Sequence, residues 1–323
     1  MAQDDNEKKP AGSQMRAKLH AWWEGYVYEP RPQAKAPAAS PAPAAGAADA
    51  KHPDPVRLPT DGKVVVKDQW PPERIKVAQL IWGDGFTFPG GEEFAVEMAR
   101  PLALHDGDTA MDLGCGLGAG TRAIAKAYGA WMEGYDLSPD LAKSGNNMSH
   151  AANMERKAPI GLLDVVDGSF KPKRYDGALV RNVFSMISDK PKLLTRLVHG
   201  MKPGGRLVVV DWTIAREDAM GDALDAYRLG EATAPRLSTV AQFTAQLEAA
   251  GLAVKIADDF TDAFRAVVLE GWSRIETIVD RGQLKPDEGK ALMDEAKLWS
   301  RRLAAVAAGD LRVGRFLAER KPA

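Results

Sequence analysis

The sequence feature that most constrains the fold is the glycine-rich stretch at residues 111–120, which reads MDLGCGLGAG. It overlaps a short apolar run at residues 109–113, and the residues that follow, 121–128, repeat their apolar positions with the period of a helix. This order predicts a buried strand, a glycine turn and a helix. Glycine has no Cβ, so the backbone of such a turn can bend tightly and approach a nucleoside-like ligand.

The glycine spacing by itself leaves the ligand open. Gly114, Gly116 and Ala119 also satisfy the dinucleotide-binding pattern, in which Asp136 stands near the position of a ribose-binding acid. A nicotinamide-dependent enzyme is therefore one alternative, which failure to bind the reduced dinucleotide would dismiss.

Asp112 lies two residues before the first glycine, and the resulting D-x-G-x-G-x-G order resembles that of class I S-adenosylmethionine-dependent methyltransferases. A second stretch, residues 201–211, reads MKPGGRLVVVD and resembles the turn and fifth strand of the same enzymes. The resemblance implies S-adenosyl-L-methionine as the cofactor. It also implies that the glycine loop wraps an amino acid and a ribose, because this ligand has no pyrophosphate.

Strands and helices alternate along most of the chain. Strands are predicted at residues 109–113, 131–136, 160–164, 176–180, 206–211, 253–258 and 313–318. Helices are predicted at residues 73–82, 92–104, from Pro139 onward, 190–200, 217–229, 240–250, 263–279 and 286–308. The predicted fold class is α/β, a doubly wound, mostly parallel seven-stranded sheet of the Rossmann-like methyltransferase type. The two helices before the first strand are placed to cap the cofactor cleft.

The first 62 residues differ in composition from the rest of the chain. Alanine and proline dominate residues 31–60, which predicts a disordered tail at 1–62 and one methyltransferase-type domain at 63–323. Within the tail, residues 15–28 carry aromatic side chains near helical spacing beside basic ones. We predict a peripheral membrane or protein contact for this segment, with folding back onto its own domain as the alternative.

Charge and cysteine content narrow the possible partners. The sequence has 43 Lys and Arg against 44 Asp and Glu, so no overall field attracts nucleic acid or an anionic membrane. Cys115 is the single cysteine, which excludes an internal disulfide and fits a reducing, cytoplasmic location. We interpret it as a small loop residue. No apolar run approaches the roughly 18 to 20 residues that span a bilayer.

Beyond the cofactor loop, residues 69–321 resemble the phosphoethanolamine methyltransferases and, more loosely, the sarcosine and dimethylglycine methyltransferases. The resemblance lies in residues 81–91 (IWGDGFTFPGG), 180–191 (VRNVFSMISDKP) and 308–316 (AGDLRVGRF). It implies cofactor contacts at several positions, and Asp112 of the glycine loop is one of them. Gly114, Gly116 and Gly118 would face the methionine part, Asp136 with Leu137 the ribose, Asp164 or else Asp167 the adenine amine, and Arg181 and Asn182 the methionine end.

Two positions depart from that family. Where its members have a tyrosine and a histidine that hold and deprotonate the substrate amine, this chain has Trp70 and Met186. Neither side chain can take a proton, and an ammonium is no nucleophile until it loses one. In the segment that resembles the phosphate-binding region, residues 232–237, Arg236 is the one obvious anion ligand. The resemblance therefore does not imply that this chain shares the substrate of that family.

Aromatic side chains are the more prominent feature of the expected acceptor site. They are Trp70, Trp82, Phe86, Phe88, Phe184 and Trp212. Aromatic faces stabilise a sulfonium or a methylated amine by about 0.5 to 2 kcal/mol each, and they equally suit a flat or lipid-like acceptor. For Trp82 and Phe184, packing in the core is the alternative.

Asp211 is the first candidate for orienting or deprotonating the acceptor, because it ends a strand at the sheet edge where ligands bind in this architecture. The histidines His105, His150 and His199 are interpreted as structural or solvated, and no cysteine and histidine spacing typical of a metal site is evident.

Three hypotheses follow for the function. The first is methylation of a small-molecule or lipid-type acceptor, with N-methylation of an amine favoured by the resemblance. The second is C- or O-methylation of an apolar acceptor such as a quinol. The third is a non-catalytic cofactor-binding subunit recruited by its tail. The sequence leaves the acceptor and the oligomeric state open.

Overall fold

The computed structural model describes residues 70–165, 168–275, 279 and 284–321. Its α-helices are α2 (Pro72–Trp82), α3 (Gly91–Ala99), α4 (Ala119–Tyr128), α5 (Pro139–Ala151), α6 (Lys190–Gly200), α7 (Asp222–Gly230), α8 (Val240–Ala249), α9 (Thr261–Ser273) and α11 (Pro286–Ala307). Its strands are β1 (Thr109–Leu113), β2 (Trp131–Asp136), β3 (Ile160–Leu162), β4 (Tyr175–Arg181), β5 (Met201–Ile214), β6 (Leu252–Asp259) and β7 (Leu311–Arg320). Two short 3₁₀ helices are Arg100–Leu102 and Phe184–Met186.

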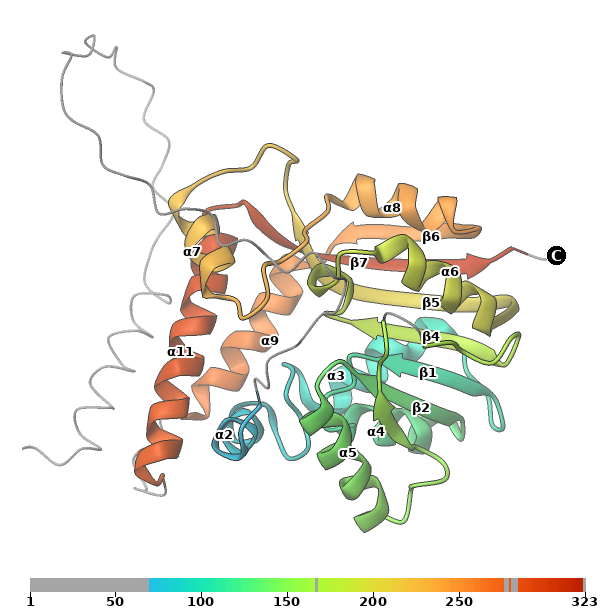
Figure 1. Cartoon of the computed structure of the whole chain (residues 1–323), viewed down its shortest axis with the longest axis horizontal. Helices are drawn as coiled ribbons and strands as arrows, with labels where there is room; N and C mark the ends of the chain where they lie inside the picture. The colour runs from blue at the N-terminus through green and yellow to red at the C-terminus, as the bar shows by residue number, and fades with distance from the viewer. Residues whose placement is uncertain (1–69, 166–167, 276–278, 280–283, 322–323) are drawn as a thin grey trace, which may run out of the picture.

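The seven strands form one sheet in the order β3-β2-β1-β4-β5-β7-β6 (Figure 1). The first five strands of that order run parallel, whereas β7 pairs antiparallel with both β5 and β6. The order reverses between β1 and β4. In open sheets of this kind, ligands bind outside the carboxyl ends of the strands at such a reversal.

Side chains of β5 alternate between two hydrophobic cores, as the period of a strand requires. Val208 and Val210 point into a core that contains residues of α3, α4 and α9. Leu207 and Val209 point into a second core on the other face, with residues of α6 and α8. Both faces of the sheet are therefore covered, which accounts for the nearly continuous apolar sequence of its central strands.

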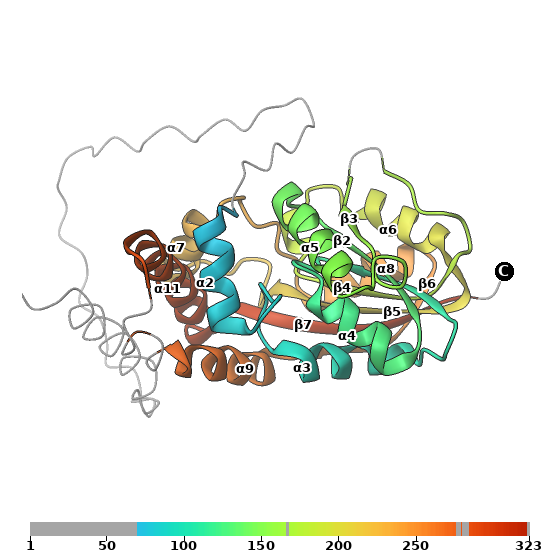
Figure 2. The ribbon, with the colours of Figure 1, turned by 90° about the horizontal axis from the view of Figure 1, so that it is seen from below.

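Four helices stand together at one end of the sheet, namely α2, α7, α9 and α11, and Figure 2 shows the same grouping from below. α11 packs against both α2 and α7. Trp82 of α2 packs edge-on against Trp272 and Trp299, and an ion pair of 2.7 Å joins Lys76 to Glu288. Two segments that are more than 200 residues apart in the sequence thus form one wall.

The structure confirms the predicted fold class and all seven strands. Several helix bounds differ from the prediction. The helix predicted at 92–104 ends at Ala99 and is followed by a 3₁₀ helix, and the one predicted from residue 263 begins at Thr261. The helix predicted from residue 217 begins at Asp222, because residues 215–218 make a turn in which the Ala219 N–H donates to the Arg216 carbonyl. The predicted tail and the segment 15–28 lie outside the described residues. Across the part of the chain that is described, no helix is long and apolar enough to cross a membrane.

Candidate cofactor and acceptor site

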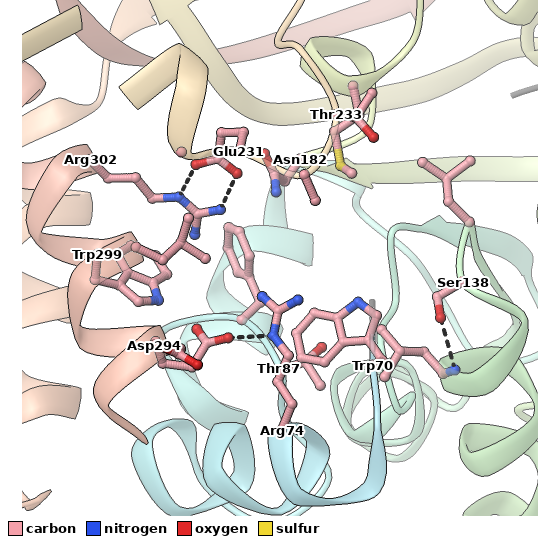
Figure 3. Close-up of a pocket in the computed structure, with 18 of the residues that line it drawn as sticks. Trp70, Arg74, Thr87, Ser138, Asn182, Glu231, Thr233, Asp294, Trp299 and Arg302 are labelled. Atoms are coloured by element: carbon pink, nitrogen blue, oxygen red, sulfur yellow. Dashed lines mark hydrogen bonds and ion pairs between the residues drawn. The ribbon is translucent and has the colours of Figure 1, made fainter. Parts of the chain in front are cut away.

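A cavity of about 830 Å³ opens at the carboxyl ends of the parallel strands. Its floor consists of residues at or just after the carboxyl ends of β1, β2 and β4, together with Trp212 near the end of β5. Its walls come from the start of α2, from α11 between Asp287 and Arg302, and from the end of α7. Figure 3 shows Trp70 and Arg74 on the α2 side and Arg302 with Glu231 on the α11 and α7 side. A cavity of this size holds ligands in the range of a nucleoside plus a small molecule.

Gly114 is the glycine of the loop that lines the cavity. Its φ is +77°, and a Cβ added there would lie 2.1 Å from the carbonyl oxygen of Arg181. Gly116 and Gly118 do not line the cavity. The Gly116 N–H donates to Asp136. Gly118 lies directly before α4, and a Cβ added to it would be only 2.5 Å from the Ile160 side chain. Two of the three predicted contacts to the methionine part are thus replaced by roles in shaping the loop.

Asp136 ends β2 and lines the cavity, as predicted, with Leu137 and Leu141 beside it. One of its carboxylate oxygens accepts from the Gly116 N–H at 2.8 Å and the other from the Ser138 N–H at 2.9 Å. Burial raises the pKa of this carboxyl, and the two backbone hydrogen bonds lower it in part. Each carboxylate oxygen can accept two hydrogen bonds, so both keep capacity for a pair of ribose hydroxyls.

Asp112 and Arg181 form a buried ion pair under the glycine loop. Arg181 Nη2 donates to both oxygens of Asp112 at 2.9 and 2.7 Å, and the Thr121 hydroxyl donates to Asp112 at 2.7 Å. Asp112 is fully buried and does not line the cavity, whereas Arg181 and Asn182 do. Asp112 was predicted to bind the cofactor. Its buried position shows instead that it binds the Arg181 side chain and holds it in place.

Asp211 is not placed to act as a base, contrary to the sequence prediction. It does not line the cavity, and its carboxylate accepts hydrogen bonds from the backbone N–H groups of Val183, Phe184 and Trp212 at 2.7 to 2.9 Å. Burial raises the pKa of the Asp211 carboxyl and these donors lower it. Asp211 therefore fixes the turn after β4, and with it the cavity wall at Ser185 and Met186.

We expect Asp211→Asn to reduce the free energy of unfolding by about 1 to 3 kcal/mol, because an amide presents only one acceptor oxygen to these backbone donors. Denaturant unfolding measures this loss. The pH dependence of turnover should keep its shape, since no proton of the reaction passes through Asp211. Disappearance of an ionisation from that pH profile would restore Asp211 as a base.

The predicted aromatic residues divide into two groups. Trp70, Trp212 and Phe88 line the cavity, and so does Met186. The others do not: Trp82 is 2 % exposed between Trp272 and Trp299, Phe184 packs on Phe243, and Phe86 packs against the first core. Trp82 and Phe86 were predicted to contact substrate, and the structure corrects both to core packing.

Two predicted polar contacts also fall outside the cavity lining. Arg236 uses its N–H to bind the Ser185 carbonyl, and its own carbonyl accepts from Lys190. Asp164 is exposed beyond the end of β3. The alternative to it, Asp167, is outside the described residues.

Several cavity residues escaped sequence reasoning because they come from α7 and α11. Arg302 of α11 makes two hydrogen bonds to Glu231, at 2.7 and 2.8 Å, and its guanidinium lies 4.7 Å from the ring centre of Trp299. Arg74 pairs with Glu295 across α2 and α11 and lies 4.2 Å from the ring centre of Trp70. No periodic pattern could indicate that these helices face the cofactor loop.

The cavity offers little acid–base chemistry. Its described lining contains no histidine, and the partly buried Glu231 and the buried Glu295 are each bound to an arginine. Asp136 accepts two backbone hydrogen bonds, and Glu73, Asp287 and Asp294 are the other carboxylates of the lining. No cluster of three or more metal-ligating side chains occurs within the described residues. The site is therefore suited to binding and aligning reactants more than to moving protons.

Two known proteins that resemble this chain are methyltransferases. Phosphoethanolamine N-methyltransferase 3 of Arabidopsis thaliana is 26% identical over 244 residues, covering 75% of this chain and 48% of that protein. The chloroplastic tocopherol O-methyltransferase of the same plant is 32% identical over 170 residues, covering 46% of this chain and 49% of that protein. The chain thus spans about half the length of these curated relatives.

A solved structure, phosphoethanolamine N-methyltransferase 2 of Haemonchus contortus in complex with S-adenosyl-L-methionine, superposes with a TM-score of 0.68 at 21% identity. The match covers 77% of this chain and 57% of that one, and it confirms the fold. Residues 92–255, just over half of the chain, match the family described as methyltransferase domain. The chain belongs to this methyltransferase family.

Proposed function

We propose that the protein transfers a methyl group from S-adenosyl-L-methionine to a small-molecule acceptor. The observation that carries the proposal is one continuous cavity, in which Asp136 and Gly114 at the strand ends face the same space as Trp70 and Trp212. The cofactor, when bound, supplies a methyl group attached to a sulfonium. The cradle at Gly114 and the remaining acceptor capacity of Asp136 fit its amino-acid and ribose parts.

The residues of the chain act by binding and alignment. Asp136 accepts hydrogen bonds from the ribose hydroxyls, Leu137 packs beside them, and Arg181 with Asn182 borders the methionine end. The aromatic walls would hold the acceptor atom in line with the methyl group that the bound cofactor would supply. Alignment of two reactants supplies several kcal/mol, on the order of 7 to 11 in well-oriented cases.

The acceptor atom has two candidates. An amine nitrogen is favoured because several relatives are named N-methyltransferases of phosphoethanolamine. An oxygen or carbon of an apolar acceptor is favoured by Trp70 and Met186, which line the cavity where an amine-binding site would need a base. An ammonium would have to arrive already deprotonated.

The experiment is incubation of the protein with radiolabelled cofactor and a panel of amines, phosphobases and quinols, alongside calorimetry of cofactor binding. Labelled product from one class supports the proposal and names the acceptor atom. Cofactor binding without transfer to any of them would favour a non-catalytic cofactor-binding subunit. Absence of cofactor binding contradicts the proposal.

We also propose a cytoplasmic location and a peripheral membrane or protein contact through residues 15–28. A reducing compartment such as the cytoplasm is supported by Cys115, which is buried in the glycine loop. Burial raises the pKa of its thiol well above the ordinary value, so the side chain stays protonated and unreactive.

A further inference from the structure

Tyr227 of α7 places a hydroxyl on the wall of the cavity. Its side chain is 2 % exposed, it lines the cavity, and its ring lies 6.3 Å from that of Trp212. Its hydroxyl makes no hydrogen bond within the described residues and is not among the fully buried polar atoms there that lack a partner. A hydroxyl that faces a cavity without a protein partner is available to a ligand.

Arg302 supplies a second unused donor at the same place. Its Nε and Nη2 bind Glu231, whereas Nη1 has no hydrogen-bond partner in the described part of the chain. The Glu231 N–H donates to the Tyr227 carbonyl at 3.2 Å, and the Glu231 carboxylate binds Arg302, so the three residues are neighbours. Burial raises the pKa of Tyr227 well above its ordinary value, so its hydroxyl remains a donor. Tyr227 of α7 and Arg302 of α11 therefore place two donors on the same part of the cavity wall.

The cation beside Tyr227 is already balanced, because Arg302 is bound to Glu231. Arg74 and Arg181 of the cavity wall are likewise bound to Glu295 and Asp112. Arg301 also lines the cavity, and it is exposed and has no ion pair within the described residues. A phosphate dianion beside Tyr227 would need an uncompensated cation at that position, whereas an uncharged oxygen needs only the two donors.

The walls around the donors are aromatic. Trp212, Trp299 and Trp70 line the same cavity, and each has a neighbour against its ring. Tyr227 is tilted against Trp212, and the guanidinium groups of Arg302 and Arg74 lie over Trp299 and Trp70. A flat ring fits between such faces and positions its substituents toward the donors. An aromatic molecule with an oxygen substituent has both the flat ring that suits the walls and the oxygen that suits the donors.

We propose that the Tyr227 hydroxyl and Arg302 Nη1 form an acceptor subsite for an uncharged hydroxyl or carbonyl oxygen on a flat apolar molecule, and not for a phosphorylated amine. The proposal rests on the proposed function and names the class of its acceptor.

Ligand-observed NMR on the full chain with S-adenosylhomocysteine present tests the subsite, with methylhydroquinone, toluene and phosphoethanolamine as probes. We expect methylhydroquinone to bind more tightly than phosphoethanolamine. Tyr227→Phe should weaken methylhydroquinone about fivefold, the value of one neutral hydrogen bond, and leave toluene unchanged. The control Tyr128→Phe removes a hydroxyl that binds the Val96 carbonyl away from the cavity and should change neither probe.

Three results would overturn the subsite: tighter binding of phosphoethanolamine, no binding of methylhydroquinone, or equal effects of Tyr227→Phe on methylhydroquinone and toluene. Calorimetry with S-adenosylhomocysteine alone distinguishes a failure of the subsite from a failure of the proposed function. If the nucleoside binds and the probe contrast fails, only the subsite is wrong. If the nucleoside itself fails to bind, the proposed function is wrong.

Discussion

Replacing Asp136 with alanine is expected to weaken the binding of S-adenosyl-L-methionine at least about 100-fold. The carboxylate lines the cavity and keeps a free lone pair on each oxygen for a ribose hydroxyl. A hydrogen bond to a charged group contributes about 1.5 to 3 kcal/mol, and two of them correspond to two or more powers of ten in affinity. Isothermal calorimetry on the wild type and the variant measures the difference.

The loss should also depend on pH in the wild type. Burial raises the pKa of Asp136 above its ordinary value, and the carboxylate is the form that accepts both hydroxyls. Affinity is therefore greatest above this raised pKa and falls as the pH drops through it. Asp136→Ala, which has no such group, should lose that part of the pH dependence.

Asp262→Ala serves as the matched control, because Asp262 is an exposed acid in the first turn of α9 and does not line the cavity. Its affinity should equal that of the wild type. Asp136→Ala also leaves the Gly116 and Ser138 N–H groups without their acceptor, so the melting temperature without ligand must be recorded for each protein. A folded Asp136→Ala protein that binds within about threefold of wild type would refute the proposed cofactor site.

Local sequence patterns predicted the sheet because each strand carries its own signal. β1 and β2 have the predicted bounds, since β1 is an apolar run that ends at the glycine turn and β2 lies between Gly129 and the helix that begins at Pro139. The position of Asp136 at the cavity follows from the same pattern, because it is the last residue of β2. The strand after residue 160 was predicted two residues too long, because Leu163 is buried although it lies outside the strand.

Side-chain direction in the helices could not be predicted in the same way. Trp82 is aromatic and ends the capping helix, which suggested a ligand contact, but its ring is enclosed by Trp272 and Trp299 from two distant helices. Asp211 was predicted to end its strand at the functional edge. β5 instead continues to Ile214, and the backbone of the turn after β4 uses the Asp211 carboxylate. Packing between elements that are far apart in sequence decides both cases, and one sequence does not contain that information.

The most destabilising single change that we expect is Asp112→Ala. Arg181 is 5 % exposed, so removing Asp112 leaves a cation buried without its carboxylate and the Thr121 hydroxyl without its acceptor. Breaking a buried pair from one side costs about 3 to 5 kcal/mol, which is a large share of the 5 to 15 kcal/mol typical of a domain. Denaturant unfolding measures the loss. Glu270→Ala, which breaks the exposed pair with Arg274, should stay within about 0.5 kcal/mol.

The double variant Asp112→Ala with Arg181→Met separates the structural from the binding role of this pair. Without the buried cation, it should be more stable than Asp112→Ala alone, because an apolar side chain needs no partner. It should nevertheless bind S-adenosyl-L-methionine more weakly than wild type, since Arg181 lines the cavity and its buried Nε has no hydrogen-bond partner within the described residues. Recovery of stability together with full affinity would show that Arg181 supports only the loop. Failure to recover stability would mean that the guanidinium itself, through its packing against α4, holds the strand ends together.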